Sequence, residues 1–303
     1  MLALFGPTAS GKSAIAHALA VELDGEVVVA DPFQRYRGLE IAADSPRADA
    51  LREVSYHLVG DLELSEGSTA GQYASAAHGA IDSIAARGRV PLVAGGTGLY
   101  LRAALCELDM RPPPPAEVRE WAEGLVQDLP AAIEELAERD PAAAASVDAA
   151  NPRRVARALE RAAMGDAATG QDIWSAPYRR PVALVHVERP AEVLANMISA
   201  RVRRELDEGL EQELERALNT PELARGPAQV IGMSEVRAIR EGTMNASALE
   251  DSLCVRTRRL ARMQRTWMRR MRPDLVIDLG ERPATDAVPE VAALWRRLRE
   301  GVV

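Results

Sequence analysis

The stretch GPTASGKS, residues Gly6 to Ser13, decides the fold of this 303-residue chain. It fits the pattern G-x-x-x-x-G-K-[ST], in which backbone N–H groups of a glycine-containing loop surround phosphate oxygens. The apolar run Leu2 to Phe5 precedes the loop, and residues 13–20 follow it with helical spacing. This order of strand, loop and helix predicts a phosphate-binding loop.

Lys12 is the only lysine in the chain, although arginines are abundant. A lysine side chain is a slim point charge that fits beneath a phosphate loop, whereas a planar guanidinium is too broad. We therefore expect Lys12 to hold phosphate and the Ser13 hydroxyl to bind Mg²⁺. The loop residues expected to bind phosphate are Gly6, Thr8, Ala9, Ser10, Gly11, Lys12 and Ser13.

The composition is that of a globular protein, with 47% hydrophobic and 27% charged residues. No run reaches the roughly 18 apolar residues that would suggest a membrane span, and we see no signal peptide. Two cysteines, Cys106 and Cys254, are too few for a disulfide framework or a zinc site, so we expect a reduced, cytoplasmic setting and a monomer. The net charge of −8 argues against general nucleic-acid binding unless basic residues gather on one face.

Short apolar and β-branched runs predict a parallel sheet. The expected strands are residues 2–5, 25–31, 90–94, 182–187 and 275–278, and helices are expected over 68–87 and 190–218. Asp31 ends the second run, which would place its carboxylate at the edge where doubly wound sheets bind ligands. The predicted fold class is α/β, a P-loop NTPase-like parallel sheet flanked by helices.

The proline run RPPPP at residues 111–115 interrupts this pattern. From there to about Tyr178 the chain has helical spacing and no candidate strand. The sequence therefore predicts an all-helical insert domain over residues 111–179. Residues 1–110 and 180–303 would form the catalytic core.

The segment Arg256 to Arg272 holds eight arginines and no acidic residue. A set recurring at steps of four and three would share one helix face: Arg258, Arg262, Arg265, Arg269 and Arg272. An apolar set on another face is expected to pack on the core: Leu260, Met263, Trp267 and Met271. Eight like charges repel one another unless an anion docks, although a merely solvated face is the alternative.

Two reaction types fit a phosphate loop followed by a carboxylate at the next strand. In a kinase, Asp31 would accept a proton from an acceptor hydroxyl or help to hold the metal. In a transferase with a diphosphate leaving group, Asp31 would position and deprotonate the nucleophile. The loop stabilises negative charge in both cases, so it does not distinguish them.

Four segments together resemble the bacterial tRNA dimethylallyltransferases (tRNA isopentenyltransferases, of the IPP transferase family). They are GPTASGKS, D-x-x-Q-x-Y-R-G at Asp31 to Gly38, GGTGLYL at Gly95 to Leu101, and TRRLARMQRTW at Thr257 to Trp267. Supporting matches are His57-Leu58, RRVARALE at 153–160, ARVRRELDEGL at 200–210 and IGMSE at 231–235.

The resemblance implies transfer of a dimethylallyl group from dimethylallyl diphosphate to the exocyclic amine of the adenosine 3′ of the anticodon, with a helical insert that binds tRNA. Lys12 and Ser13 would bind diphosphate and Mg²⁺, and Asp31 would orient the amine and take its proton. Thr97 would lie beside the diphosphate or the reacting centre, and Arg201 would clamp the diphosphate. Residues expected to contact the tRNA anticodon stem-loop are Gln34, Tyr36, Arg154, Arg157, Arg258, Arg262, Gln264 and Arg265.

The chain departs from the family pattern at several positions. Pro32 replaces the usual serine after Asp31, and the segment usually written G-T-A-K-P is Ala42-Ala43-Asp44-Ser45-Pro46. Further departures are Arg35, Tyr56, Met197, Met233 and Met263. The alternatives are a free adenine-nucleotide (cytokinin-type) prenyltransferase, a small-molecule P-loop kinase and a nucleotide-binding module without activity.

Overall fold

The computed structural model describes residues 1–108, 113–166 and 173–301. The chain divides into two compact units, one formed by Met1–Leu108 with Ala176–Val303 and the other by Asp109–Ser175. The division lies close to the expected insert boundaries at residues 111 and 179. The arginine-rich segment, which ends at Arg272, lies in the first unit.

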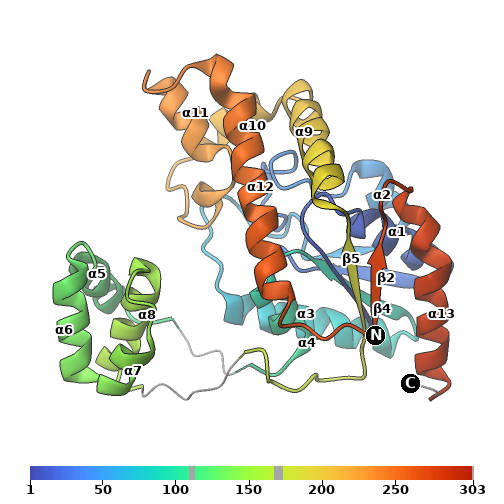
Figure 1. Ribbon diagram of the computed structural model, residues 1–303, viewed down its shortest axis with the longest axis horizontal. Coiled ribbons are helices and arrows are strands. Elements are labelled where there is room, and N and C mark those ends of the chain that lie inside the picture. The colour runs from blue at the N-terminus through green and yellow to red at the C-terminus, as the bar shows by residue number, and fades with distance from the viewer. Residues whose placement is uncertain (109–112, 167–172, 302–303) are drawn as a thin grey trace. The chain divides into compact units, whose positions relative to one another are not determined.

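Within the described residues, one sheet of six parallel strands runs in the order β3-β2-β4-β1-β5-β6. This sheet lies at the centre of the first unit, between its helices (Figure 1). The strands are β1 (Leu2–Phe5), β2 (Gly25–Val29), β3 (Tyr56–His57), β4 (Val90–Gly95), β5 (Ala183–Glu188) and β6 (Leu275–Asp278). The predicted α/β fold class is confirmed. Strand β3 was missed because two residues are too short for a periodic signal.

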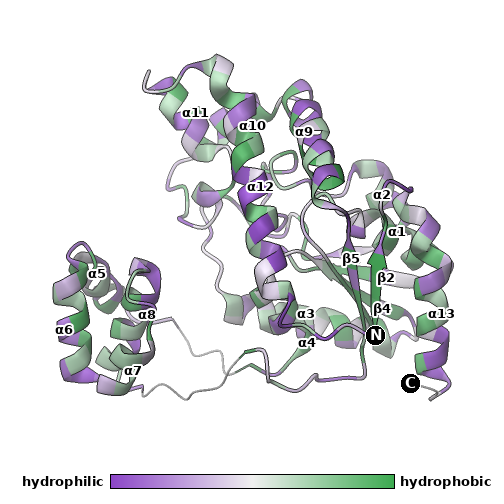
Figure 2. Ribbon diagram, in the orientation of Figure 1, coloured by the Kyte–Doolittle hydropathy of each residue, from purple (hydrophilic) through white to green (hydrophobic). Residues whose placement is uncertain are grey.

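Helices cover both faces of the sheet. Helices α1 (Lys12–Glu22) and α13 (Val288–Arg299) share a buried apolar cluster with alternate strand residues such as Leu2, Leu4 and Val27. Helices α3 (Ala70–Ala86) and α4 (Gly98–Leu105) pack on the opposite face. Because both faces are covered, the central strands β1 and β4 are buried throughout and carry no polar side chain. Figure 2 colours the residues of the sheet by hydropathy.

The remaining helices of the first unit form a second apolar cluster around Leu194, Leu214 and Leu253. They are α9 (Ala191–Asp207), α10 (Leu210–Leu218), α11 (Met233–Arg240) and α12 (Leu249–Met268); α2 (Ala48–Glu53) and the 3₁₀ turns Pro227–Gln229, Ala246–Ala248 and Ala284–Ala287 complete the unit. The single helix predicted over 190–218 is wrong. It is interrupted at Gly209, which has a φ of 97° that ends one helix and begins the next.

The prediction for the arginine-rich segment also needs correction. Helix α12 ends at Met268, so Arg269 and Arg272 lie beyond it. Its buried face carries Thr257, Ala261 and Gln264, whereas Met263 of the predicted apolar face is 51% exposed. The apolar periodicity misidentified the face because two buried positions on this helix are polar.

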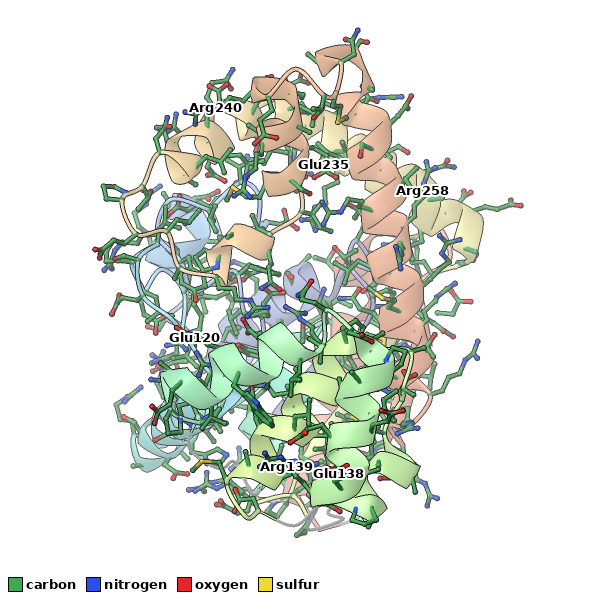
Figure 3. The ribbon with its side chains drawn as sticks, turned by 90° about the vertical axis from the view of Figure 1, so that its left-hand side faces the viewer. Glu120, Glu138, Arg139, Glu235, Arg240 and Arg258 are labelled. Carbon is green, nitrogen blue, oxygen red and sulfur yellow. The ribbon has the colours of Figure 1, made fainter. Side chains whose placement is uncertain are left out.

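The second unit is all-helical over its described residues, as predicted. Its helices are α5 (Ala116–Leu125), α6 (Leu129–Arg139), α7 (Pro141–Ser146) and α8 (Pro152–Ala163). The last three begin with an Asp or Asn side chain that accepts a backbone N–H, followed by proline in the first turn. Arg139 of α6, labelled in Figure 3, lies 4.8 Å from the ring centre of Trp121.

Candidate active site

The phosphate loop connects β1 to α1 at the carboxyl end of the central strand. Gly11 has a φ of 99°, and a Cβ there would lie 2.8 Å from the Ala284 side chain, so only glycine fits. Lys12 begins α1, where the free backbone N–H groups and the helix dipole favour an anion. Burial lowers the pKa of Lys12, and the carboxylates of Asp31 and Asp44 oppose that shift.

Asp31 lies just beyond β2, at the same edge of the sheet as the loop. Its Oδ1 accepts a hydrogen bond of 2.9 Å from the N–H of Phe33. Pro32 therefore leaves this local turn intact, because the donor is the next residue. Burial raises the pKa of Asp31, and the N–H of Phe33 and the positive charge of Lys12 oppose the rise.

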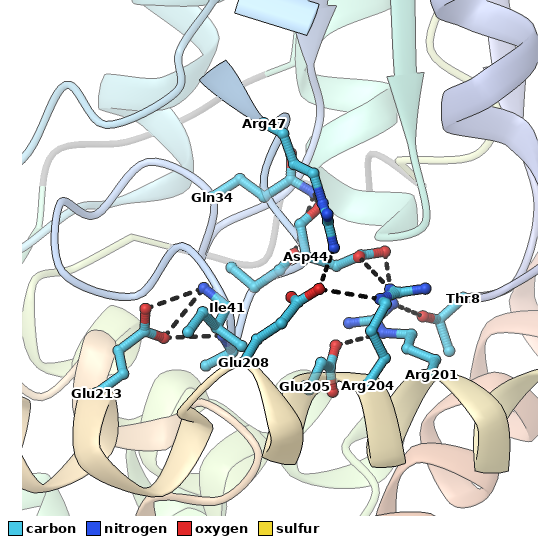
Figure 4. Close-up of polar contacts among 12 residues, drawn as sticks. Thr8, Gln34, Ile41, Asp44, Arg47, Arg201, Arg204, Glu205, Glu208 and Glu213 are labelled. Carbon is cyan, nitrogen blue, oxygen red and sulfur yellow. Dashed lines mark hydrogen bonds and ion pairs between the residues drawn. The ribbon is translucent and has the colours of Figure 1, made fainter. Parts of the chain in front are cut away.

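Arg201 extends from α9 to the phosphate loop, where its Nη1 donates to Oγ1 of Thr8 at 2.8 Å (Figure 4). Its Nε donates to Glu205 at 2.6 Å, and the same Nη1 lies 3.1 Å from Oδ2 of Asp44. Burial lowers the pKa of Arg201, but the two carboxylates outweigh that effect and raise it overall. The guanidinium therefore remains charged beside the loop.

A second long-range contact supports the loop from α12. The backbone N–H of Thr8 donates to Oε1 of the buried Gln264 at 2.8 Å. The glycine-rich turn after β4 allows this approach, because a Cβ on Gly96 would lie 2.5 Å from Nε2 of Gln264. A Cβ on Gly98 would likewise lie 2.5 Å from the ring of Trp267. Two glycines of the GGTGLYL segment thus make room for two side chains of TRRLARMQRTW.

Two cavities open on these groups, one of about 90 Å³ and one of about 500 Å³. The smaller is bordered by Thr8, Arg201 and Gln264, and the larger by α1 and β2 residues such as Ala16 and Val29. Six residues border both cavities: Lys12, Ser13, Asp31, Gln34, Asp44 and Gly96. The shared lining places an ammonium, a hydroxyl and two carboxylates around one space.

Comparison with known proteins agrees with this arrangement. The model of the IPP transferase family matches residues 34–271. The chain belongs to the IPP transferase family. It is 41% identical to a tRNA dimethylallyltransferase of Anaeromyxobacter dehalogenans (88% of this chain, 91% of the relative) and 33% identical to one of Exiguobacterium (93% and 91%).

Solved structures have the same fold. The tRNA isopentenylpyrophosphate transferase of Bacillus halodurans superposes with a TM-score of 0.72 at 28% identity, over 99% of this chain and 97% of that one. A eukaryotic dimethylallyltransferase acting on tRNA gives 0.81 at 22% identity, over 99% and 79%, and supports the fold alone. The resemblance inferred from the motifs is confirmed, and the chain is a transferase.

The structure of this transferase brings most of the predicted catalytic and phosphate residues together. Lys12, Ser13, Asp31 and Arg201 share the cavity lining, whereas Thr97 borders neither cavity. Thr97 precedes α4, and its hydroxyl does not cap that helix.

The residues predicted to contact tRNA are dispersed. Gln34 donates to the carbonyls of Ala43 and Asp44 at 3.2 Å, and Tyr36 is buried in the cluster around Leu194. Arg258 bonds to Ser199 at 2.8 Å, and Arg265 donates to the carbonyl of Arg189.

The repulsion expected among the α12 arginines is relieved in part by another helix. Arg256 donates to Glu235 of α11 at 2.6 and 2.9 Å. Glu235 and Arg258 are both labelled in Figure 3. The compensating acid was absent from the segment's own sequence, so its charge pattern alone overstated the repulsion.

Three charged groups of the site were missed. Arg189, buried after β5, donates to the carbonyls of Ser10 at 3.1 Å and Gly280 at 2.8 Å, tying the phosphate loop to the chain after β6. Glu205 and Asp44 hold Arg201. The i, i+4 spacing of Arg201 and Glu205 could have revealed their pairing. No local pattern predicts the contacts of Arg189 or Asp44.

Proposed function

We propose that this transferase moves a dimethylallyl group from dimethylallyl diphosphate to the exocyclic amine of the adenosine 3′ of the anticodon in tRNA. The observation that carries the proposal is that Asp31 and Lys12 border the same space, with Arg201 bonded to the phosphate loop beside them. The names of the relatives support the choice of tRNA and of the five-carbon donor.

In this proposal Asp31 acts on the acceptor amine, and the phosphate loop acts on the leaving group. The amine lone pair forms the new C–N bond, the allylic C–O bond breaks, and the amine proton passes to the carboxylate of Asp31. Lys12, Arg201 and the backbone N–H groups of the loop stabilise the negative charge on the departing diphosphate. The raised pKa of Asp31 suits a base that must accept a proton.

We further propose that the diphosphate binds with Mg²⁺. Ser13 borders the cavity, and its hydroxyl supplies an oxygen donor of the kind that Mg²⁺ prefers. The phosphate oxygens and water would complete the coordination, in keeping with the usual absence of a full protein cage for this ion. The metal would supply neutralising charge to the leaving group.

The tRNA is proposed to contact α12 and the helical insert. Arg262 of α12 and Arg154 and Arg157 of α8 are exposed. Arg154 and Arg157 each pair with one acid, Asp148 at 3.4 Å and Glu160 at 2.6 Å. The pair of Arg154 and Asp148 is exposed on both sides and worth little, so Arg154 can exchange its partner for phosphate. Glu160 is buried, so Arg157 would bind phosphate while it keeps this partner.

A cytoplasmic monomer remains part of the proposal. Cys106 and Cys254 are buried and free of disulfides, as expected in a reducing compartment. Among the described helices, none has the length and apolar character to cross a membrane. Light scattering during size-exclusion chromatography would test the monomer.

The test of function is a transfer assay with labelled dimethylallyl diphosphate and Mg²⁺. The acceptors are an anticodon stem-loop with adenosine 3′ of the anticodon and, in parallel, free AMP. Label in the stem-loop alone supports the proposal, and label in AMP would move the activity to free nucleotides. Label in neither acceptor would reject prenyl transfer. The kinase alternative would then be tested by measuring ATP turnover.

The assay needs a pair of matched aspartate variants. Asp31→Asn should reduce transfer by about 10² to 10⁴-fold. Asp24→Asn should leave it unchanged, because Asp24 is exposed at the opposite end of the same strand and has a φ of 49° that asparagine also adopts.

A further inference from the structure

Asp44 is a carboxylate inside the site of an anionic substrate. It borders both cavities, and its two oxygens contact Arg201 at 3.1 Å and Arg204 at 3.2 Å (Figure 4). Neither contact follows from helical spacing, because Asp44 lies in the connection between β2 and α2. Asp44 stands where the family segment G-T-A-K-P has alanine.

The backbone holds Asp44 in place. Its φ is 51°, a left-handed conformation that few residues with a side chain adopt. Nε2 of Gln34 donates to the carbonyls of Ala43 and Asp44 at 3.2 Å. The carboxylate is therefore directed at the two arginines by a defined turn, although its side chain is 43% exposed.

The contact with Arg201 uses the nitrogen that faces the phosphate loop. Nη1 of Arg201 bonds to Oγ1 of Thr8 and to Asp44, while Nε is taken by Glu205. A phosphate oxygen that approaches Arg201 on this side must compete with Asp44. Arg204 gives Asp44 a second partner that such an exchange need not disturb.

We propose that Asp44 competes with diphosphate for Arg201. It holds the guanidinium beside the phosphate loop until the leaving group replaces it, and it weakens the retention of inorganic diphosphate more than that of the allyl ester. This inference rests on the proposed function.

The preference follows from charge. Inorganic diphosphate has one more ionisable oxygen than its ester, so when fully ionised it bears more negative charge near the fixed carboxylate. The penalty from Asp44 is therefore larger for the product than for the substrate. Slow release of inorganic diphosphate would limit the turnover rate of the enzyme.

Calorimetric titration tests the inference without any transfer reaction. Inorganic diphosphate and dimethylallyl diphosphate, each with Mg²⁺ and without RNA, are titrated into wild type, Asp44→Asn and Asp44→Ala. Asparagine suits the left-handed turn, so that variant keeps the backbone. Glu40→Gln, a charge deletion in the same loop, is the matched control, since Glu40 is exposed and accepts the N–H of Gly38.

Asp44→Asn should tighten inorganic diphosphate about tenfold and the allyl diphosphate about threefold, with the gain shrinking at high salt. Glu40→Gln should change either affinity by less than about twofold. Unchanged or weaker binding by both Asp44 variants would overturn the competition, and equal tightening of the two ligands would overturn the preference. If wild type binds neither ligand, the proposed function itself fails, and the inference with it.

Discussion

Gln264, on the helix that ends at Met268, accepts a hydrogen bond from the backbone N–H of Thr8 in the phosphate loop, 256 residues away in sequence. The amide of Gln264 also lies against Gly96, at the turn after β4. Three motifs that are far apart in sequence therefore meet at one point. Rigid support of this kind fixes the N–H groups that must surround the phosphate oxygens.

Gly96→Ala tests that support. The new Cβ would lie 2.5 Å from Nε2 of Gln264 and 3.3 Å from the carbonyl oxygen of Gly6, so Gln264 must move away from Thr8. We expect affinity for Mg²⁺-diphosphate to fall about tenfold, the cost of roughly one hydrogen bond that orders the loop.

Gly79→Ala is the control, because a Cβ at Gly79 meets nothing within 4 Å. It should leave binding unchanged and stabilise α3 by about 1 kcal/mol. Equal affinities for Gly96→Ala and wild type in calorimetry would show that the Gln264 contact does not shape the loop.

The contact between Gln264 and Thr8 shows which parts of the site a local sequence pattern could predict and which it could not. The phosphate loop was recognisable because all its chemistry lies in eight consecutive residues, and Asp31 because it directly follows a buried strand. The family resemblance implied that Gln264 contacts tRNA, whereas in the structure its buried side chain contacts the phosphate loop. Its burial depends on Gly96, and no local periodicity reports a partner so far away.

Longer helices show a similar limit. Helical spacing continued through Gly209, so the pattern over 190–218 gave no boundary, and only the positive φ of that glycine separates α9 from α10. Sequence spacing identifies a helix face but not the element that will cover it. For the same reason, the spacing of the arginines did not reveal that the acid that pairs with Arg256 comes from α11.

Arg262→Ala tests the proposed RNA surface. Arg262 is exposed on α12, so its removal should weaken stem-loop binding about threefold to tenfold and reduce the dependence of binding on salt by about one ion. Filter binding at several salt concentrations measures both. The affinity for inorganic diphosphate should not change.

Arg296→Ala provides the comparison for Arg262. Arg296 is 58% exposed on α13, where it pairs with Glu22 of α1. Helices α1 and α13 cover the face of the sheet opposite to that covered by α3 and α4. Its loss should leave RNA affinity and salt dependence as in wild type. If both variants weaken RNA binding equally, the effect comes from net charge and not from the α12 surface.

Glu26 should make the fold sensitive to acid. Burial acts to raise its pKa, but hydrogen bonds from Arg87, His57 and Arg89 outweigh it and lower the pKa to about 2. A carboxylate with a lowered pKa stabilises the fold above its unfolded pKa near 4.5, and that stability is lost as pH falls toward 2.

Urea unfolding of wild type and Glu26→Gln measures this effect. The variant should lose about 2 kcal/mol at pH 7, after allowance for the solvent that screens the half-exposed arginines. The gap between the two proteins should narrow at pH 3. A gap that stays constant with pH would mean that Glu26 acts through packing and not through its charge.

Asp31→Asn should separate stability from activity. Burial raises the pKa of Asp31, so its ionisation at neutral pH costs folding free energy. The variant should therefore melt at a higher temperature than wild type at pH 7, with a difference that disappears below about pH 4, where the unfolded carboxyl is also protonated. Transfer to the stem-loop should fall by about 10² to 10⁴-fold, the usual contribution of a general base. Scanning calorimetry across pH, beside the transfer assay, checks both. A variant that is inactive and also less stable at pH 7 would indicate that Asp31 mainly holds the turn through its bond to Phe33.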